Sequence, residues 1–238
     1  MSEARATPEL DIVLPVHNEG DTIEATLREW FAELSPSTAI TFIVCEDGST
    51  DDTKNVLRRC ARDLPMALRL GEERKGYARA VIDGLKASRA PYVLAVDSDG
   101  QCDPADFWKF WRRRDEFDVI IGQRTVRADP WFRRAMSGTF KLWYRALLGV
   151  PVADPSCPYV LVRRAALDRL VPELGVLDPG LWWEFTARAY RKRVPLLEIP
   201  IHHRRRHSGA TQVFKWRKMP GIGLAHAIGL FTIWRQTR

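Results

Sequence analysis

Short apolar runs alternate with longer amphipathic segments along the first part of this chain. The segment 21–34 repeats apolar side chains at helical spacing, and Asp21 or Thr22 is suited to cap its start. Further helices are predicted at 76–87 and from the end of the polar cluster 46–53 to about residue 64. Buried strands are predicted at 10–16, 39–45, 67–70 and 92–96. Strands and helices that alternate at these lengths predict an α/β fold with a mainly parallel sheet flanked by helices.

The second half is less regular but continues the same elements. Strands are predicted at 118–122, 160–163 and 196–201, and helices at 106–114, 131–148, 181–191 and 220–238. The pattern contains no internal repeat, low-complexity tract or linker. We therefore expect one domain over 1–212, with a basic and apolar helix at 213–238 appended to it.

Polar clusters follow three of the predicted strands. They begin at His17, at Glu46 and at Asp97. In a parallel α/β sheet, ligands bind beyond the carboxyl ends of the strands, so the three clusters are expected to share one site.

The stretch Asp97-Ser98-Asp99-Gly100-Gln101 is the most informative of these clusters. Alternate residues in extended backbone point the same way, so Asp97, Asp99 and Gln101 are able to offer three oxygens to one hard cation. Mg²⁺ or Mn²⁺ suits such oxygens and leaves positions for phosphate. An Asp-rich turn without a metal is the alternative.

Composition narrows the class of partner. The chain has 238 residues, a net charge of +7 and a pI near 9.5, which suggests an anionic partner. The four cysteines are scattered and are expected to be reduced thiols of a cytoplasmic protein. No signal-peptide pattern or membrane-spanning run is evident in the sequence. A nucleic-acid partner would not explain acids at the ends of three strands.

With these motifs in order, the chain resembles the inverting family-two glycosyltransferases of the GT-A (Rossmann-like) fold. Within them it is most similar to the polyprenyl-phosphate sugar transferases, the dolichol-phosphate mannose synthase group. The start at 14–19 resembles Pro-x-Tyr-Asn-Glu with His17 in place of Tyr, 46–53 matches the second signature, and 74–80 resembles Lys-Gly-x-Gly-x-Ala. The stretch 97–101 matches the metal signature. The resemblance covers about 10–211.

The resemblance implies a donor site for a UDP- or GDP-linked sugar. Metal ligands would be Asp97, Asp99 and Gln101, with His202 or His203 as a further ligand or an ordinary histidine. Arg206 matches the Arg of the family's Arg-x-x-Gly-x-Ser loop and would clamp the diphosphate. The nucleotide sugar would contact Pro15, His17, Glu19, Asp47, Lys75, Gly76, Asp97 and Ser98. For Glu19, an interaction with the helix dipole is the alternative.

The acceptor side is implied by two further stretches. A segment like the family's Arg-x-x-x-Ser would hold an acceptor phosphate through Arg124, Arg133, Arg134 and Ser137, although a solvated basic helix face explains Arg133 or Arg134 equally well. Asp154 matches the family's active-site carboxylate. It would act as a base on a hydroxyl acceptor, or only position a phosphate that is already anionic.

Helix 181–191 offers a second base and an aromatic pair. Glu184 stands where many relatives place a catalytic acid. Because the adjacent Trp182 and Trp183 cannot both face one core, at least one is expected at a binding or membrane surface.

The chain is accordingly expected to be a metal-dependent inverting transferase that moves a sugar to polyprenyl phosphate. The same chemistry on a soluble acceptor is one alternative, and a non-catalytic nucleotide-sugar or nucleic-acid-binding protein is another. The apolar helix at the end, with its basic flanks, suits the cytoplasmic surface of a membrane. Packing against the domain itself, or against a second subunit in a homodimer, is the alternative.

Overall fold

Seven strands form one sheet in the order β3-β2-β1-β4-β6-β5-β7. The computed structural model describes residues 7–125, 131–178, 180–204 and 219–238, with the backbone alone at 131–139 and 219–224. The strands are β1 Leu10–Val16, β2 Ile40–Glu46, β3 Met66–Leu70, β4 Tyr92–Ala95, β5 Val119–Arg124, β6 Val160–Arg163 and β7 Leu196–Ile201. Pairings are parallel except those of β6, which is antiparallel to both β4 and β5. The other six strands therefore end on the same side.

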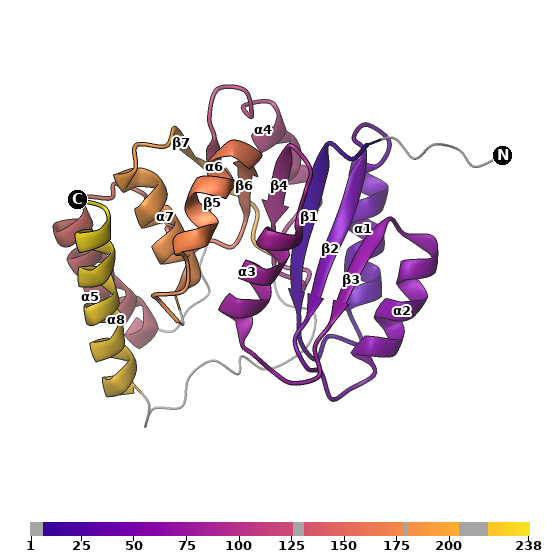
Figure 1. Ribbon diagram of the computed structural model, residues 1–238, viewed down its shortest axis with the longest axis horizontal. Helices are drawn as coiled ribbons and strands as arrows, with labels where there is room; N and C mark the ends of the chain where they lie inside the picture. Colours follow the sequence, from indigo (N-terminus) through magenta and orange to yellow (C-terminus); the bar gives the residue numbers. More distant parts are fainter. Residues whose placement is uncertain (1–6, 126–130, 179, 205–218) are drawn as a thin grey trace.

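Helices cover both faces of this sheet (Figure 1). They are α1 Ile23–Leu34, α2 Thr53–Asp63, α3 Tyr77–Ala87, α4 Phe107–Trp111, α5 Trp131–Leu148, α6 Arg164–Leu170, α7 Leu181–Arg191 and α8 Met219–Gln236, with the short turns η1 Pro104–Asp106 and η2 Val171–Glu173. Figure 1 shows α3 and α6 in front of the sheet and α1 behind it. α3 packs closely on β1 because Gly84 faces Val13, where a Cβ on the glycine would lie 2.5 Å from Val13 Cγ1.

The described side chains form two apolar clusters. The larger one fills both faces of the sheet, and its centre is β1, all of whose residues are buried. The smaller one lies between α5, α7 and α8, with Tyr144, Ala187 and Ile233 among its buried members. α8 is thus packed onto the second half of the chain, while the expected boundary at 212 lies outside the described residues.

Three local expectations differ from the structure. The helix expected at 106–114 ends at Trp111, and the helix α6 was not expected. The strand expected at 118–122 continues to Arg124, so this arginine lies at the end of β5. No helix within the described ranges is both long enough and apolar enough to cross a bilayer.

Candidate active site

The loops after β1 and β2 are joined by hydrogen bonds at the carboxyl end of the sheet. Asn18 N donates to Ser49 Oγ at 2.9 Å, and Thr50 N donates to Asn18 Oδ1 at 2.9 Å. Glu19 N donates to Thr53 Oγ1 at 2.9 Å. These long-range contacts hold the first two polar clusters of the sequence as one rigid edge.

Asp47 organises the next loop. Its carboxylate is buried and accepts hydrogen bonds from the backbone N–H of Lys75 at 2.6 Å and of Gly76 at 2.9 Å. His17 Nδ1 lies 2.8 Å from the carbonyl oxygen of Asp47, and because a carbonyl only accepts, this nitrogen carries the proton. Gly76 has φ +100°, a conformation that side chains disfavour, immediately before α3 begins. The structure therefore brings together predicted donor residues that lie far apart in the sequence.

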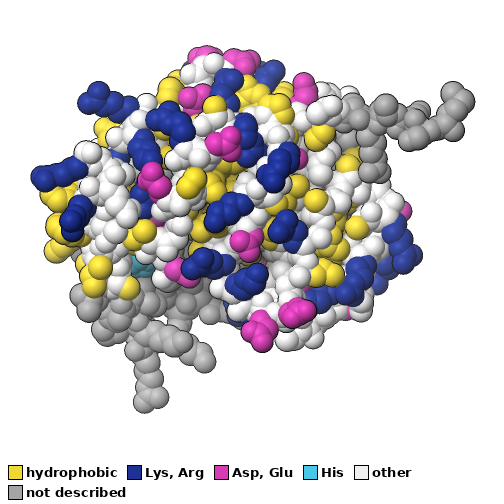
Figure 2. All heavy atoms as spheres, viewed as in Figure 1, with side chains coloured by type: hydrophobic (Ala, Val, Ile, Leu, Met, Phe, Trp, Pro, Cys, Tyr) yellow, Lys and Arg dark blue, Asp and Glu magenta, His cyan; other side chains and the backbone are white. Residues whose placement is uncertain are grey.

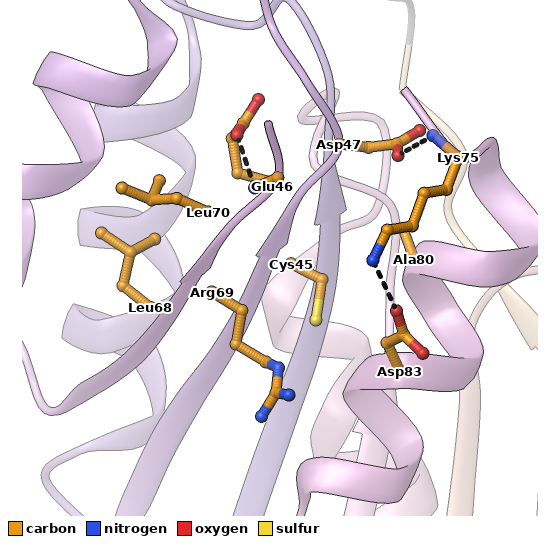
Figure 3. Close-up of a pocket in the computed structure, with 10 residues that line it drawn as sticks. Cys45, Glu46, Asp47, Leu68, Arg69, Leu70, Lys75, Ala80 and Asp83 are labelled. Atoms are coloured by element: carbon orange, nitrogen blue, oxygen red, sulfur yellow. Dashed lines mark hydrogen bonds and ion pairs between the residues drawn. The ribbon is translucent and has the colours of Figure 1, made fainter. Parts of the chain in front are cut away.

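A pocket of about 430 Å³ opens between β2, β3 and α3 beside this loop. In Figure 3, Asp47 contacts the backbone of Lys75, whose side chain extends to Asp83. The Lys75 Nζ lies 3.8 Å from Asp83 Oδ2. The pocket walls thus combine apolar strand residues with charges of both signs.

Asp97 lies beyond β4 and is held by a side chain that the sequence did not single out. The hydroxyl of Tyr77 donates to Asp97 Oδ1 at 2.7 Å, and the same hydroxyl accepts a hydrogen bond from Trp182 Nε1 at 2.8 Å. The ring of Tyr77 is partly exposed, yet desolvation of the hydroxyl and the charge of Asp97 raise the pKa of Tyr77 well above its ordinary value. The hydroxyl therefore stays a donor.

The end of β7 runs beside the aspartate pair. Gln101 Nε2 donates to the carbonyl of Arg204 at 3.0 Å, and Arg204 N donates to the carbonyl of Gln101 at 2.9 Å. Between these contacts Cys102 pairs with His203 in an isolated bridge. The amide of Gln101 thus ties the two segments together, and its role as a metal ligand stays a prediction.

The two histidines that follow β7 differ in their surroundings. His202 Nδ1 lies 3.0 Å from the buried carboxylate of Asp106. His203 Nδ1 is buried without a hydrogen-bond partner among the described residues. Burial and the charge of Arg124 lower the pKa of His203, against the opposing effect of Asp99. A neutral imidazole with an unused nitrogen near Asp99 fits a divalent cation. Within the described residues, no three His, Cys, Asp or Glu side chains form a preformed metal cluster.

Arg124 and Asp154 form a two-pronged ion pair at the other side of the site. Arg124 Nε lies 2.7 Å from Asp154 Oδ2, and Nη2 lies 3.0 Å from Oδ1. Ser156 Oγ donates to the same carboxylate at 2.9 Å. Although burial opposes it, the Asp154 carboxylate holds the pKa of Arg124 above its usual value. Asp154 is 5% exposed, so the pair is largely shielded from water.

Glu184 is a structural residue in this fold, which argues against its predicted role as a base. Its side chain is fully buried, and Oε2 accepts hydrogen bonds from the backbone N–H of Gly175, Val176 and Leu177 at 3.1, 2.9 and 2.9 Å. Oε1 accepts from Arg188 Nε at 2.9 Å. These bonds use both oxygens of the carboxylate, and they hold the loop that precedes α7.

The adjacent tryptophans also depart from expectation, because α7 lies between the two apolar clusters. Trp182 belongs to the larger cluster, and Trp183 packs against the smaller one, with ring centroids 4.8 Å from both Phe140 and Tyr144. The ring of each tryptophan therefore packs in a different apolar cluster, and only the indole N–H of Trp182 reaches toward the candidate site, through Tyr77.

Some predicted residues lie where side chains are not described. Arg206 falls outside the described residues, and Arg133, Arg134 and Ser137 are described only by the backbone of α5. Tyr77 was not among the predicted site residues, and Trp182 was predicted as a binding or membrane-surface residue rather than as a hydrogen-bond partner of Tyr77. The only local signal for Tyr77 is its position directly after Lys75 and Gly76.

The model of the family described as glycosyl transferase family 2 matches residues 11–171, which is more than half of the chain. The chain belongs to this family. An undecaprenyl-phosphate 4-deoxy-4-formamido-L-arabinose transferase from Enterobacter sp. (strain 638) is 24% identical over 89% of this family-2 chain and 64% of its own length. The transferase of the same name from Salmonella dublin is 26% identical over the same shares. The chain therefore spans about 64% of the length of these relatives.

Solved structures agree with the fold of this family-2 chain. Glucosyl-3-phosphoglycerate synthase from Mycobacterium tuberculosis, in complex with Mn²⁺, UDP and glucosyl-3-phosphoglycerate, has a TM-score of 0.68 at 18% identity and covers 95% of this chain and 80% of its own. The mannosyltransferase from Pyrobaculum calidifontis with GDP-Man and Mn²⁺ has a TM-score of 0.59 at 19% identity, covering 82% and 55%. The expected GT-A architecture is confirmed.

Proposed function

We propose that this chain is a metal-dependent inverting glycosyltransferase that moves a sugar from a UDP- or GDP-linked donor to the phosphate of a polyprenyl lipid. The names of the curated relatives and the bound nucleotides of the structural neighbours support this proposal. The ion pair between Arg124 and Asp154 is the observation that favours a phosphate acceptor over a hydroxyl acceptor.

A hydroxyl acceptor has to lose its proton during transfer, which requires a base. Asp154 is a poor base here, because both of its oxygens are bound by the guanidinium of Arg124. Glu184 is enclosed among backbone N–H groups and Arg188. A phosphate acceptor is already anionic at neutral pH and needs no such base. The pair would then place an arginine beside the acceptor instead of removing a proton.

The donor half is proposed from the residues that the structure gathers at the strand ends. Asp47 fixes the backbone at Lys75 and Gly76, and that backbone leads into α3 beside Asp97. Proposed contacts of the nucleotide sugar are Pro15, His17, Glu19, Asp47, Lys75, Gly76, Asp97 and Ser98. Arg206 is still predicted to bind the diphosphate. The residues predicted to bind the acceptor phosphate are Arg124, Arg133, Arg134 and Ser137.

Mg²⁺ or Mn²⁺ is proposed as the cofactor, held by Asp97, Asp99 and Gln101 with His203 as a further ligand. When bound, such an ion neutralises the charge that develops on a leaving diphosphate. The neutral imidazole of His203 beside Asp99 supports this set. In the transfer, a phosphate oxygen of the acceptor attacks the anomeric carbon while the bond from that carbon to the diphosphate oxygen breaks. The nucleoside diphosphate leaves with the electron pair, and the configuration inverts.

An exposed apolar face on α5 and α8 is proposed to contact an anionic membrane surface. Leu142 and Trp143 on α5 are 68% and 65% exposed, and Ile228 and Phe231 on α8 are 60% and 55% exposed. Figure 2 shows hydrophobic side chains together with Lys and Arg side chains at the left edge of the molecule, over these two helices. Aromatic and apolar side chains flanked by cations suit the lipid interface. Such contact would bring the site to a lipid-linked acceptor at the cytoplasmic face.

The transfer proposal is tested with a panel of UDP- and GDP-sugars in Mn²⁺ or Mg²⁺. Undecaprenyl phosphate, dolichyl phosphate and 3-phosphoglycerate are offered as acceptors, and products are identified by mass spectrometry. Glycosylated lipid phosphate is expected. Transfer to the hydroxyl of 3-phosphoglycerate alone would refute the lipid acceptor, and nucleotide binding without transfer or donor hydrolysis would favour a binding protein. Transfer that continues undiminished in EDTA would refute the metal.

The membrane proposal is tested by cosedimentation with phosphatidylglycerol and phosphatidylcholine vesicles. Phe231→Asp is expected to weaken binding to the anionic vesicles, because it places a charge in the apolar face. Tyr190→Asp is the control, since Tyr190 is an exposed aromatic residue that belongs to α7 rather than to α5 or α8. Equal binding by both variants would contradict the assignment, and a loss of dimers measured by sedimentation would instead favour a subunit contact.

A further inference from the structure

Asp97 is reached by a hydrogen-bond chain whose direction is fixed by chemistry. An indole N–H can only donate, and an ionised carboxylate can only accept. The single hydroxyl proton of Tyr77 therefore points to Asp97, 2.7 Å away, while its oxygen accepts from Trp182 at 2.8 Å. The chain runs one way, from Trp182 through Tyr77 to Asp97.

The two side chains that donate these hydrogen bonds, Trp182 and Tyr77, are both anchored in the fold. Tyr77 is the first residue of α3, and the backbone just before it is held by the two N–H bonds to Asp47. Trp182 is 5% exposed and lies edge-on to Phe185 with ring centroids 5.7 Å apart. The loop before its helix is held by the carboxylate of Glu184. The hydroxyl of Tyr77 therefore has little freedom to move away from Asp97.

We propose that Tyr77 is a positioning residue of the donor site, which holds Asp97 in its binding orientation by a hydrogen bond that Trp182 in turn orients. This inference rests on the proposed function, because it assigns Asp97 to the donor and its metal. A hydrogen-bond donor that keeps a metal-binding carboxylate in one conformation reduces the entropy lost when the metal and the nucleotide bind. In this role Tyr77 itself contacts neither of the reacting atoms.

The consequence is a loss of donor affinity when the hydroxyl is removed. Tyr77→Phe keeps the ring and its packing but leaves Asp97 without this donor. Loss of a hydrogen bond to a charged group lowers affinity by about tenfold, at the lower end of the range for such bonds. We expect the KM for the donor to rise about tenfold while kcat changes by less than about threefold.

The same pair of hydrogen bonds predicts how Trp182 contributes to donor binding. Trp182→Phe retains an aromatic ring in the core but removes the N–H that orients the hydroxyl. Its effect on the donor KM is expected to be smaller, and to disappear in the background of Tyr77→Phe, because the hydroxyl it orients is then absent. Matched controls are Tyr190→Phe on the exposed side of α7 and Trp183→Phe in the smaller apolar cluster.

The experiment measures binding of Mn²⁺ with UDP, and of Mn²⁺ with GDP, by calorimetry and by the Mn²⁺ electron paramagnetic resonance signal. Wild type, the two single variants, the double variant and both controls are compared, with thermal unfolding recorded for each. Weaker binding in Tyr77→Phe at an unchanged melting temperature, with unaffected controls, supports the inference. If wild type binds and Tyr77→Phe binds equally well, the inference is overturned while the proposed function stands. If wild type binds neither nucleotide with Mn²⁺, the proposed function fails and the inference fails with it.

Discussion

The substitution Glu184→Gln distinguishes a structural role of this carboxylate from a catalytic one. Glu184 accepts three backbone hydrogen bonds and pairs with Arg188, and both side chains have no exposed surface. A glutamine has the same shape, but its NH₂ group must face either the three N–H donors or the guanidinium. Each choice sets donor against donor and leaves the buried charge of Arg188 less compensated.

The expected cost follows from the burial of the pair. Removing one partner of a buried ion pair destabilises a protein by about 3–5 kcal/mol. For a chain of this size that corresponds to a fall in Tm of about 6–20 °C. Arg188 keeps an ion pair with Glu173 at 3.0 Å, which favours the lower half of this range.

The assay is thermal unfolding followed by circular dichroism, together with the transfer assay at a temperature where the variant is folded. Glu24→Gln is a closely matched control, because Glu24 and Arg28 form the same i,i+4 pair on α1 but are 44% and 49% exposed. No resolvable change in Tm is expected for this control. The reasoning would be refuted if Glu184→Gln melted like wild type and yet lost transfer by a factor of a thousand, since that is the behaviour of a catalytic base.

Three further predictions follow from the site. Asp154→Asn should lower kcat by less than about tenfold, because Asp154 positions Arg124 for an anionic acceptor. Loss of a general base would instead lower kcat by about 10²–10⁴-fold. A pH-rate profile of the variant, with wild type as reference, distinguishes the two roles. Asp47→Asn should weaken binding of UDP or GDP with Mn²⁺ by about tenfold, as measured by calorimetry. The amide nitrogen of the variant would face one of the two backbone N–H groups and cannot accept a hydrogen bond from it. Unchanged binding would contradict the role of Asp47 in ordering this loop. Burial raises the pKa of Cys45 to about 11 and of Cys157 to about 12, so both thiols should resist iodoacetamide at pH 8 until the protein unfolds, as read by mass spectrometry. Because these folded-state pKa values exceed the ordinary value of 9.0, the stability they confer is complete below pH 9 and is lost as the pH rises through 11 and 12.

The sheet, and the points where polar clusters follow its strands, were predictable because their signals are local. β1 and β6 were expected at their observed bounds, and the acids at Asp47 and Asp97 mark the points where buried runs end. The reversal of β6 was not predictable, because a strand buried on both faces reads the same in either direction.

The sequence also misled at α7. A carboxylate beside two tryptophans is consistent with a substrate site when the helix is considered alone. In the fold, three N–H groups of the preceding loop surround Glu184, and the second apolar cluster receives Trp183. Neither surrounding is encoded within the helix itself.

Hydrophobic periodicity was therefore enough to predict the architecture, and the ends of the predicted strands marked the position of the aspartate pair. The family came from the resemblance of the ordered motifs to known sequences. The periodicity and the strand ends both depend on neighbours within a few residues, which is the range over which a sequence pattern acts. The orientation of Asp97 by Tyr77 and Trp182, which are 105 residues apart, and the neutralisation of Asp154 by Arg124 were decided by tertiary packing. Hydrogen bonds between side chains that are distant in the sequence form only where the fold brings donor and acceptor together in alignment, and no local sequence pattern records that alignment.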